Sequence, residues 1–182
     1  MSTKRLFVSL DLPPIVAAAL VRLNPQLAGV RWLPAEQLHL TLAFFGDVAP
    51  EMEEKLAGKL RVIHFARFFL PIAGVGTFPS RGEPKIIWIG VGRGHPHLFQ
   101  LHKLVTDAAL AAGLEPDLRP WHPHITLARC RDVSRQTIQR FLREHADAEF
   151  GLTPIDSFSL QSSRLTPAGS VYDCELRISP RA

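Results

Sequence analysis

A short motif occurs twice, and it places histidine and threonine at the same spacing in two distant parts of the chain. Residues 39–49 read HLTLAFFGDVA and residues 124–134 read HITLARCRDVS, and the two align without a gap at a constant offset of 85 residues. His, Thr, Leu, Ala, Asp and Val are identical between the copies. Packing alone rarely requires a matched His-x-Thr, because both side chains carry polar groups that need partners. The repeated motif is therefore the first candidate for a functional site.

If both motifs form strands, His39 and Thr41 share one face, and so do His124 and Thr126. Two imidazoles in one cleft suit in-line phosphoryl transfer, in which one oxygen loses a proton while the opposite oxygen gains one. An imidazole pKa near ~6.5 makes either protonation state accessible, and the two hydroxyls can donate to the non-bridging oxygens. This scheme requires no metal and no cofactor. The apolar residues of the motifs are expected to point into the core: Leu40, Leu42, Ile125 and Leu127.

The elements that must position these motifs also repeat. Apolar periodicity predicts helices over residues 14–24, 50–63, 96–112 and 134–146. Alternating and β-branched stretches predict strands over residues 6–10, 38–45, 69–76, 85–91, 122–128, 152–161 and 171–178. The order strand, helix, strand, helix, strand thus occurs over roughly 5–76 and again over 85–161. The sequence predicts two similar α/β lobes related by an approximate twofold axis.

Composition sets wider limits. The 182 residues, of which 46% are hydrophobic, suit one compact domain spanning 1–182. Two cysteines provide no disulfide framework and fit a reducing compartment, and no stretch approaches the ~20 apolar residues of a membrane span. We therefore expect a cytoplasmic protein that is a monomer. A net charge of +4 permits an anionic partner but is equally typical of a generic basic surface.

The paired motifs HLTL (39–42) and HITL (124–127) resemble those of the 2H phosphoesterases. The stretches RLFVSLDLP, VRWLPAEQLHLTLAFFGDV, FPSRGEPKIIWIGV and RPWHPHITLAR are similar to the bacterial and archaeal RNA 2′,3′-cyclic phosphodiesterases, also called 2′-5′ RNA ligases. The resemblance covers nearly the whole chain. It implies a bilobal α+β fold in which antiparallel sheets form a central cleft and the lobes partly exchange strands. It also implies a hydrolase that opens an RNA 2′,3′-cyclic phosphate to a 2′-phosphomonoester, with reversible 2′-5′ ligation.

The resemblance also assigns roles to the motif residues. It makes His39 the proton donor to the leaving 3′ oxygen and His124 the proton acceptor that activates water. It makes Thr41 and Thr126 phosphate-binding residues, and it implies RNA ends with a 2′,3′-cyclic phosphate as partners, tRNA fragments or short oligonucleotides among them. The residues alone leave the acid and the base open, because the repeat makes the two histidines nearly equivalent.

Four further residues are candidates for contacting substrate. Arg129 can pair with a phosphate, although strict alternation puts it on the face opposite His124, so a bulge would be needed to re-aim it. Phe7 and Trp32 could stack on a base, whereas most aromatic residues in strands belong to the core. His122 is expected at the start of the second motif's strand, near the cleft.

Two other functions remain open at this stage. The same cleft could hold a nucleotide or RNA end without turning it over, as a binding module does, although binding alone needs no acid and base. A metallohydrolase built on His39, His122 and His124 is the other alternative, since neutral imidazole is a common metal ligand. Activity in the presence of a chelator would separate the last alternative from the metal-independent scheme.

Overall fold

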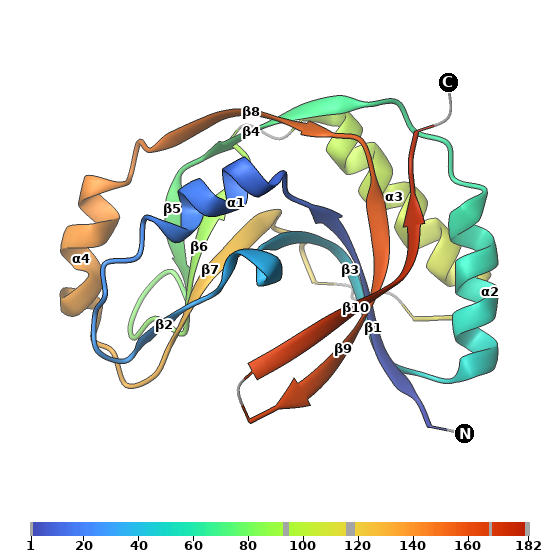
Figure 1. The fold of residues 1–182 in the computed structure, drawn as a ribbon, viewed down its shortest axis with the longest axis horizontal. Coiled ribbons are helices and arrows are strands. Elements are labelled where there is room, and N and C mark those ends of the chain that lie inside the picture. The colour runs from blue at the N-terminus through green and yellow to red at the C-terminus, as the bar shows by residue number, and fades with distance from the viewer. Residues whose placement is uncertain (1, 93–94, 116–118, 168, 181–182) are drawn as a thin grey trace.

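The computed structural model describes residues 2–92, 95–115, 119–167 and 169–180. Over these residues the chain forms four α-helices, one short 3-10 helix and ten β-strands (Figure 1). The helices are α1 (Pro14–Val21), α2 (Pro50–Arg61), α3 (Pro96–Ala111) and α4 (Arg135–Glu144), with η1 at Ala35–Gln37. The strands are β1 (Lys4–Asp11), β2 (Val30–Trp32), β3 (His39–Val48), β4 (Phe68–Ala73), β5 (Val75–Phe78), β6 (Ile86–Gly90), β7 (His124–Cys130), β8 (Glu149–Ile155), β9 (Phe158–Thr166) and β10 (Gly169–Ile178).

The helices begin where the sequence predicts. Pro occupies the first turn of α1, α2 and α3, where its missing N–H has no intrahelical partner to lose. The fourth helix starts after Ser134, whose hydroxyl accepts a hydrogen bond from the Thr137 amide at 3.2 Å. Acidic residues in the first turn of α2 and basic residues in its last turn complement the helix dipole. Proline in the first turn of three helices and the Ser134 cap of the fourth thus agree with where the helices begin.

The strands form two antiparallel sheets, which confirms the predicted α+β class. The larger sheet has the order β10-β9-β1-β3-β7-β6-β5, with β2 paired to the outer part of β7, and the smaller sheet is the ribbon β4-β8. In Figure 1, α2 and α3 lie side by side at one end of the molecule and α4 lies at the other. The order strand, helix, strand, helix, strand is found in β1-α1-β3-α2-β4 and in β6-α3-β7-α4-β8.

Two predicted strands were wrong because each is broken into two. The stretch 69–76 divides into β4 and β5 at Gly74, whose φ of +77° suits glycine, and the stretch 152–161 divides into β8 and β9. The first pieces, β4 and β8, pair with each other. The second pieces pair elsewhere, β5 with β6 and β9 with β1. Each half of the chain thus sends a strand to the sheet of the other half. The three-residue strand β2 was not predicted.

The two halves of the larger sheet meet at a single residue pair. Leu40 of β3 lies opposite Ile125 of β7, and no other pair of these strands is in register. The apolar residues of both motifs, Leu40, Leu42, Ile125 and Leu127, are at most 1% exposed, as predicted. Full burial of side chains of this size stabilises the fold by roughly 1.5–3 kcal/mol each, so the motifs are anchored from behind. Their polar faces are then held where the two strands diverge.

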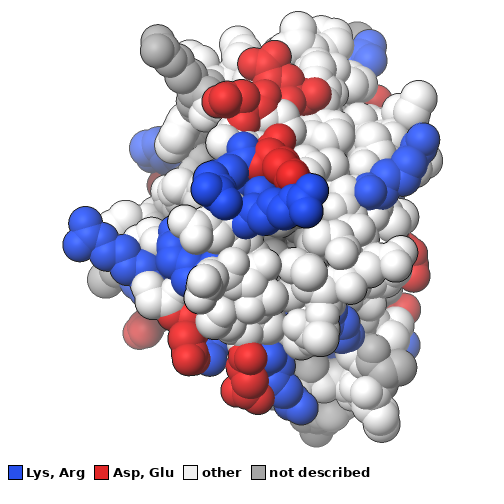
Figure 2. Space-filling model, turned by 90° about the vertical axis from the view of Figure 1, so that its left-hand side faces the viewer, with Lys and Arg blue, Asp and Glu red and all other residues white. Residues whose placement is uncertain are grey.

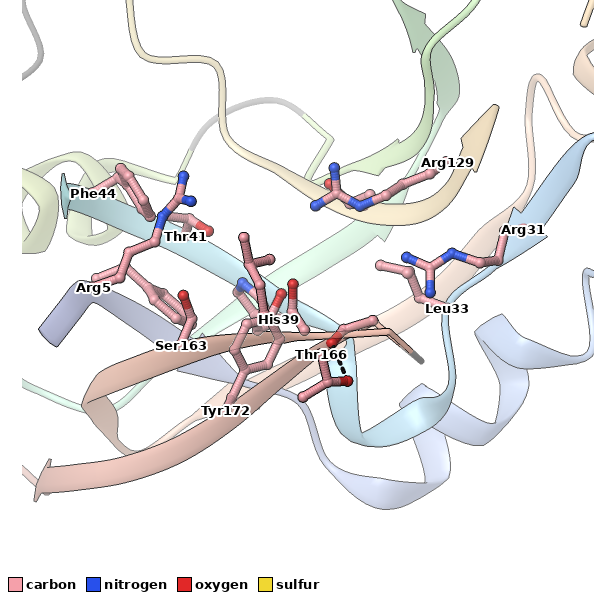
Figure 3. Close-up of a pocket in the computed structure, with 15 residues that line it drawn as sticks. Arg5, Arg31, Leu33, His39, Thr41, Phe44, Arg129, Ser163, Thr166 and Tyr172 are labelled. Carbon is pink, nitrogen blue, oxygen red and sulfur yellow. Dashed lines mark hydrogen bonds between the residues drawn. The ribbon is translucent and has the colours of Figure 1, made fainter. Parts of the chain in front are cut away.

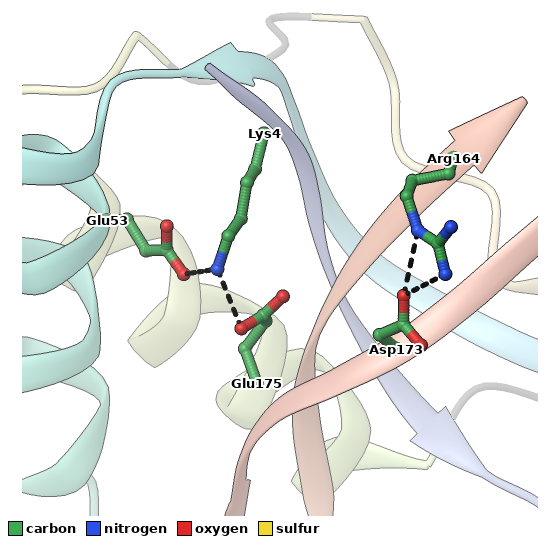
Figure 4. A network of polar contacts seen from close by, with 5 residues as sticks. All are labelled: Lys4, Glu53, Arg164, Asp173 and Glu175. Atoms are coloured by element: carbon green, nitrogen blue, oxygen red, sulfur yellow. Dashed lines mark hydrogen bonds and ion pairs between the residues drawn. The ribbon is translucent and has the colours of Figure 1, made fainter. Parts of the chain in front are cut away.

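Ion pairs connect β1, α2 and the β9–β10 hairpin at one edge of the larger sheet. Lys4, at the start of β1, bridges Glu53 of α2 and Glu175 of β10 at 2.8 Å each, and Arg164 pairs with Asp173 across the β9–β10 hairpin (Figure 4). All are partly exposed, and such pairs are worth about 0–1 kcal/mol each. Their contribution to the free energy of folding is therefore small.

Charge on the outer surface is mixed. On the face shown in Figure 2, the face nearest α4 in Figure 1, Lys and Arg form short separate groups, Asp and Glu lie among them, and much of the surface is uncharged. No continuous basic surface covers that face, so a bound anion there would meet only local positive charge. Among the described residues, no helix is both long enough and apolar enough to cross a membrane.

Candidate active site

The register of β3 and β7 decides how the two motifs face each other. Because the two strands are antiparallel and Leu40 lies opposite Ile125, His39 and Thr126 follow on one side of this pair, and Thr41 and His124 follow on the other, where the strands diverge. All four side chains are on the face opposite the buried leucines and isoleucine. The approximate twofold relation therefore passes through the Leu40–Ile125 pair and gives each histidine a hydroxyl from the other motif.

Two cavities open beside this pair and meet at Thr41 and Phe44. The first has a volume of about 470 Å³ and is lined by His39, Thr126 and three arginines, Arg5, Arg31 and Arg129 (Figure 3); we call it the arginine cavity. The second has about 490 Å³ and is lined by His124 together with aromatic side chains, including Phe45, Phe78 and Trp121; we call it the aromatic cavity. Each of the two cavities thus contains one of the motif histidines.

His39 is held by its backbone neighbour and by two rings. Its Nδ1 lies 2.9 Å from the carbonyl oxygen of Gln37. Since a carbonyl only accepts, Nδ1 carries a proton and donates it, and Nε2 is left for chemistry. The ring packs against Phe7 and against the edge of Tyr172, with centroid distances of 5.0 and 5.2 Å. The imidazole is thereby fixed in both tautomer and orientation.

His124 has the matching arrangement. Its Nδ1 donates to the carbonyl oxygen of His122 at 2.7 Å, and Phe78 packs edge-on to its ring at 5.0 Å between centroids. Trp88 supports this cluster from β6, and its indole lies so close over Gly76 that any β-carbon there would sit 2.2 Å from the ring. Gln37 and His122 are equivalent in the repeat, so the two motifs share the backbone carbonyl that holds the imidazole and differ in the side chain of the residue that supplies it.

The pKa values of both histidines are lowered from their ordinary value. Burial is the main cause of the lowered pKa of His39, and the positive charges of His124 and Arg129 lower it further, while the Gln37 carbonyl and Asp11 raise it. Burial likewise lowers the pKa of His124, against the opposing effect of its bond to the His122 carbonyl. Their charges are close enough for His124 to disfavour the protonated form of His39. Both rings are therefore poised to exchange protons near or below neutral pH.

A bulge aims Arg129 into the cleft. In the β6–β7 pairing, Ile87 lies opposite Ala128 and Trp88 opposite Thr126, so β7 carries an extra residue at Leu127. The extra residue reverses the alternation, buries both Leu127 and Ala128, and turns Arg129 to the face of Thr126, where it lines the arginine cavity. The sequence identified the need for such a bulge.

The same bulge is present in the first motif. Val8 lies opposite Ala43 and Ser9 opposite Thr41, so β3 carries its extra residue at Leu42, which is equivalent to Leu127. Phe44 then occupies the position equivalent to Arg129 and lines both cavities. Its ring lies 5.0 Å beneath the guanidinium of Arg5, a cation–π contact. The twofold relation thus extends to the backbone irregularity but places a cation in one motif and an aromatic ring in the other.

The remaining candidate residues have different fates. Phe7 is buried beneath His39 and lines the arginine cavity. His122 lies before β7, not at the start of the strand, because β7 begins at His124; its exposed ring lines the aromatic cavity 6.2 Å from that of His124. Trp32 lines neither cavity: its indole donates to the Leu20 carbonyl at 3.3 Å and packs edge-on against Phe141 of α4.

Several site residues were missed by the sequence. Arg5 and Arg31 line the arginine cavity, and Tyr172 lies beside His39 on the β9–β10 hairpin. Asp11 of β1 pairs with the backbone of His39 and supplies a carboxylate behind the imidazole, where Arg177 and Ser159 each contact it at 2.9 Å. No motif marks these residues, since strand pairing alone brings them to the site.

The described part of the chain contains no group of three or more His, Cys, Asp or Glu side chains placed to hold a metal ion. His122 and His124 share a cavity, whereas His39 lines the other one.

Comparison with known proteins assigns the family. A model described as LigT like phosphoesterase matches residues 10–88 and again residues 90–172, one motif in each match. The chain belongs to the LigT-like phosphoesterases. Among relatives of this family, the RNA 2′,3′-cyclic phosphodiesterase of Thermus thermophilus is 35% identical, with 92% of this chain and 86% of the relative covered. The enzyme of the same name from Aeropyrum pernix is 33% identical, with 75% and 78% covered.

Solved structures agree with the family assignment. Escherichia coli LigT complexed with 3′-AMP superposes with a TM-score of 0.80 and 26% identity over 99% of both chains. The TT0787 protein of Thermus thermophilus gives a TM-score of 0.79 and 28% identity over 96% of this chain and 97% of its own. The resemblance noted in the sequence is therefore confirmed, and the chain has the fold of a LigT-like phosphoesterase throughout.

Proposed function

We propose that this protein hydrolyses RNA 2′,3′-cyclic phosphates to 2′-phosphomonoesters by metal-independent acid–base catalysis between His39 and His124. The observation that carries the proposal is the pairing of each imidazole with a hydroxyl of the other motif: His39 and Thr126 line one cavity and His124 and Thr41 line the other, and in both rings the hydrogen bond from Nδ1 leaves Nε2 for chemistry. The name RNA 2′,3′-cyclic phosphodiesterase, shared by relatives from archaea and bacteria, supports the choice of substrate.

In the proposed reaction the phosphorus lies between the two imidazoles. His124 Nε2 takes a proton from water, whose oxygen attacks phosphorus opposite the 3′ oxygen. As the P–O3′ bond breaks, His39 donates its Nε2 proton to the leaving 3′ oxygen. The phosphate remains on the 2′ oxygen. Thr41 and Thr126 donate to the non-bridging oxygens, and Arg129 balances their charge. The fixed Nδ1–H tautomers ensure that the same nitrogen acts in every turnover.

The arginine cavity suits the RNA strand that carries the cyclic phosphate. Arg5, Arg31 and Arg129 line a space of about 470 Å³, much more than one phosphate group fills, and Ser163 adds a hydroxyl from β9. Phosphate-rich ligands are held chiefly by such guanidinium groups. Short RNA ends, including tRNA fragments, are thus the proposed partners of a monomeric enzyme. The reaction is reversible in principle, with a 5′-hydroxyl replacing water to form a 2′-5′ linkage.

The first prediction concerns the product. An RNA oligonucleotide ending in a 2′,3′-cyclic phosphate is expected to be converted to the 2′-phosphate, and the rate should be unchanged by EDTA. The position of the phosphate can be read from ³¹P NMR or from resistance to an enzyme that removes only 3′-phosphates.

Two results would select the alternative functions. Tight binding of the RNA end without any product would favour a binding module. Loss of turnover in EDTA, restored by a divalent ion, would favour a metal-dependent hydrolase instead.

A second prediction concerns pH. The productive form of the pair carries one proton, and it is most abundant between the two macroscopic pKa values of the pair. Because both pKa values are lowered, kcat/KM should be bell-shaped, with its basic limb below about pH 6.5. The value of kcat/KM falls as pH rises because the acid, His39, loses its proton. It falls as pH drops because the base, His124, gains one.

Bound substrate should move this profile. A phosphodiester anion between the rings favours protonated imidazole, so the kcat profile is expected at higher pH than the kcat/KM profile. Initial rates at a series of pH values and substrate concentrations measure both. A rate that does not change with pH through the imidazole range would contradict the assignment.

A further inference from the structure

The aromatic cavity is far larger than the water molecule that hydrolysis requires on its side. It contains His124 and Thr41, and its volume of about 490 Å³ compares with the ~30 Å³ share of one water in the liquid. Its walls come from β3, from the end of β5, from α3 and from the segment before β7, and they include Phe45, Phe78 and Trp121. A purely hydrolytic site has no evident need for such a space.

The walls of the aromatic cavity are rigidly held. The Trp121 indole donates to the Thr41 carbonyl at 3.2 Å and stacks on His102 at 3.9 Å between centroids, with only 8° between the planes. His102 in turn bonds to the Leu42 carbonyl at 2.9 Å. Both anchors are backbone atoms of the first motif, so the aromatic wall is fixed to the strand that carries Thr41. A preformed flat apolar wall beside a reacting phosphate suits a nucleobase.

The stereochemistry of the proposed reaction decides which nucleoside occupies which cavity. In an in-line displacement the attacking and leaving oxygens lie on opposite sides of phosphorus. The ribose of a cyclic phosphate carries the leaving 3′ oxygen, so it lies on the side of the acid, His39, which lines the arginine cavity. The attacking oxygen lies on the side of His124, which lines the aromatic cavity.

We infer that the aromatic cavity binds the nucleoside that supplies a 5′-hydroxyl in place of water, and the same nucleoside when it leaves in the reverse reaction. This inference rests on the proposed function and on its assignment of acid and base. In the forward step, the 5′ oxygen bonds to phosphorus and gives its proton to His124, while the P–O3′ bond breaks and the 3′ oxygen takes a proton from His39. The product is a 2′,5′-phosphodiester with a free 3′-hydroxyl.

The test compares leaving groups in the reverse direction. A 2′,5′-linked dinucleotide and the 2′-methyl phosphodiester of the same nucleoside carry different leaving alcohols, a nucleoside that can fill the cavity and methanol, which cannot. Base stacking is worth enough for the wild-type protein to favour the dinucleotide by about tenfold or more in kcat/KM. Thr106 of α3, which lines the cavity, offers a way to fill it with Thr106→Phe. This variant should abolish the preference while changing hydrolysis of a mononucleoside 2′,3′-cyclic phosphate by less than about twofold.

Leu110→Phe is the matched control, one helical turn further along α3 at a side chain that is 52% exposed. It should keep the wild-type preference. A second measurement needs no variant: adenosine added to the cyclic phosphate should divert product to the 2′,5′-dinucleotide, whereas ethanol at the same concentration should not.

Equal rates for both leaving groups in the wild type, or a parallel loss of cleavage and hydrolysis in Thr106→Phe with its fold intact, would overturn the inference. Absence of any hydrolysis of cyclic phosphates by the wild type would instead overturn the proposed function.

Discussion

Replacing His39 or His124 by alanine is expected to lower kcat by about 10²–10⁴-fold, the range in which general acid–base groups usually contribute. Each variant leaves one proton transfer without a partner, because the neighbouring Thr126 or Thr41 hydroxyl is far too weak an acid or base to take over. The effect should fall on kcat more than on KM, since the substrate can still be held by hydroxyls and arginines. Rates with an RNA 2′,3′-cyclic phosphate measure it directly.

A leaving group that needs no proton tells the two histidines apart. With bis(p-nitrophenyl) phosphate, the phenolate departs without help, so the variant that lacks the acid should regain most of the wild-type rate and the variant that lacks the base should not. The proposal predicts that His39→Ala is the rescued variant. Equal rescue of both would leave the roles exchangeable, as the twofold relation suggests, and would contradict the assignment of His39 as sole acid.

The fold should survive both changes. The motif leucines and isoleucine remain buried, and the imidazole of His39 contributes one hydrogen bond to a backbone carbonyl, a contact worth about 1 kcal/mol. His97→Ala serves as control, because this exposed histidine of α3 contacts Phe68 and His95 and lines neither the arginine nor the aromatic cavity. Thermal unfolding monitored by circular dichroism separates loss of activity from loss of structure.

The sequence predicted the convergence of the two motifs better than the pairing of the strands around them. Repetition of His-x-Thr carried the central information, because identical spacing implied equivalent strands and alternation implied a shared polar face. Strand pairing was not accessible in the same way. Nothing in residues 69–76 or 152–161 marks the breaks that send β5 and β9 to opposite halves, since Gly74 is one of several glycines and the second break has none.

Residues that reach the site through pairing were missed for the same reason. Arg5 and Tyr172 lie near the two ends of the chain, and they line the same cavity as His39 because β1, β9 and β10 are neighbours in one sheet. Trp32 shows the converse: it lies in a stretch similar to known enzymes and was expected to contact substrate, but its indole contacts Leu20 of α1 and Phe141 of α4 and lines neither cavity. Similarity in sequence identifies such residues but does not show whether they contact substrate or pack against other parts of the protein.

The second large effect is expected at Arg129. Replacement by alanine should lower kcat/KM by about 10²-fold, comparable to removing one preorganised donor from a developing oxyanion. Arg129 is brought to the cleft by the bulge at Leu127 and lines the arginine cavity opposite the β9–β10 hairpin (Figure 3). Its positive charge also disfavours protonation of His39, so its loss should raise the pKa of that imidazole and move the basic limb of the kcat/KM profile to higher pH.

That shift distinguishes a charge at the site from a structural role. Arg129→Lys keeps the charge but loses the paired N–H groups, so it should restore the wild-type pH profile while recovering only part of the rate. Arg131→Ala is the matched control, because this arginine follows two positions later and lines neither cavity. A lower rate of Arg129→Ala with an unmoved profile would contradict an electrostatic effect of Arg129 on the pKa of His39. If instead the pH profile moves in Arg129→Ala and returns to that of the wild type in Arg129→Lys, the charge of Arg129 sets the protonation of His39. The bulge at Leu127 of β7, which brings Arg129 to the cavity, would then influence the pKa of an imidazole on the neighbouring strand.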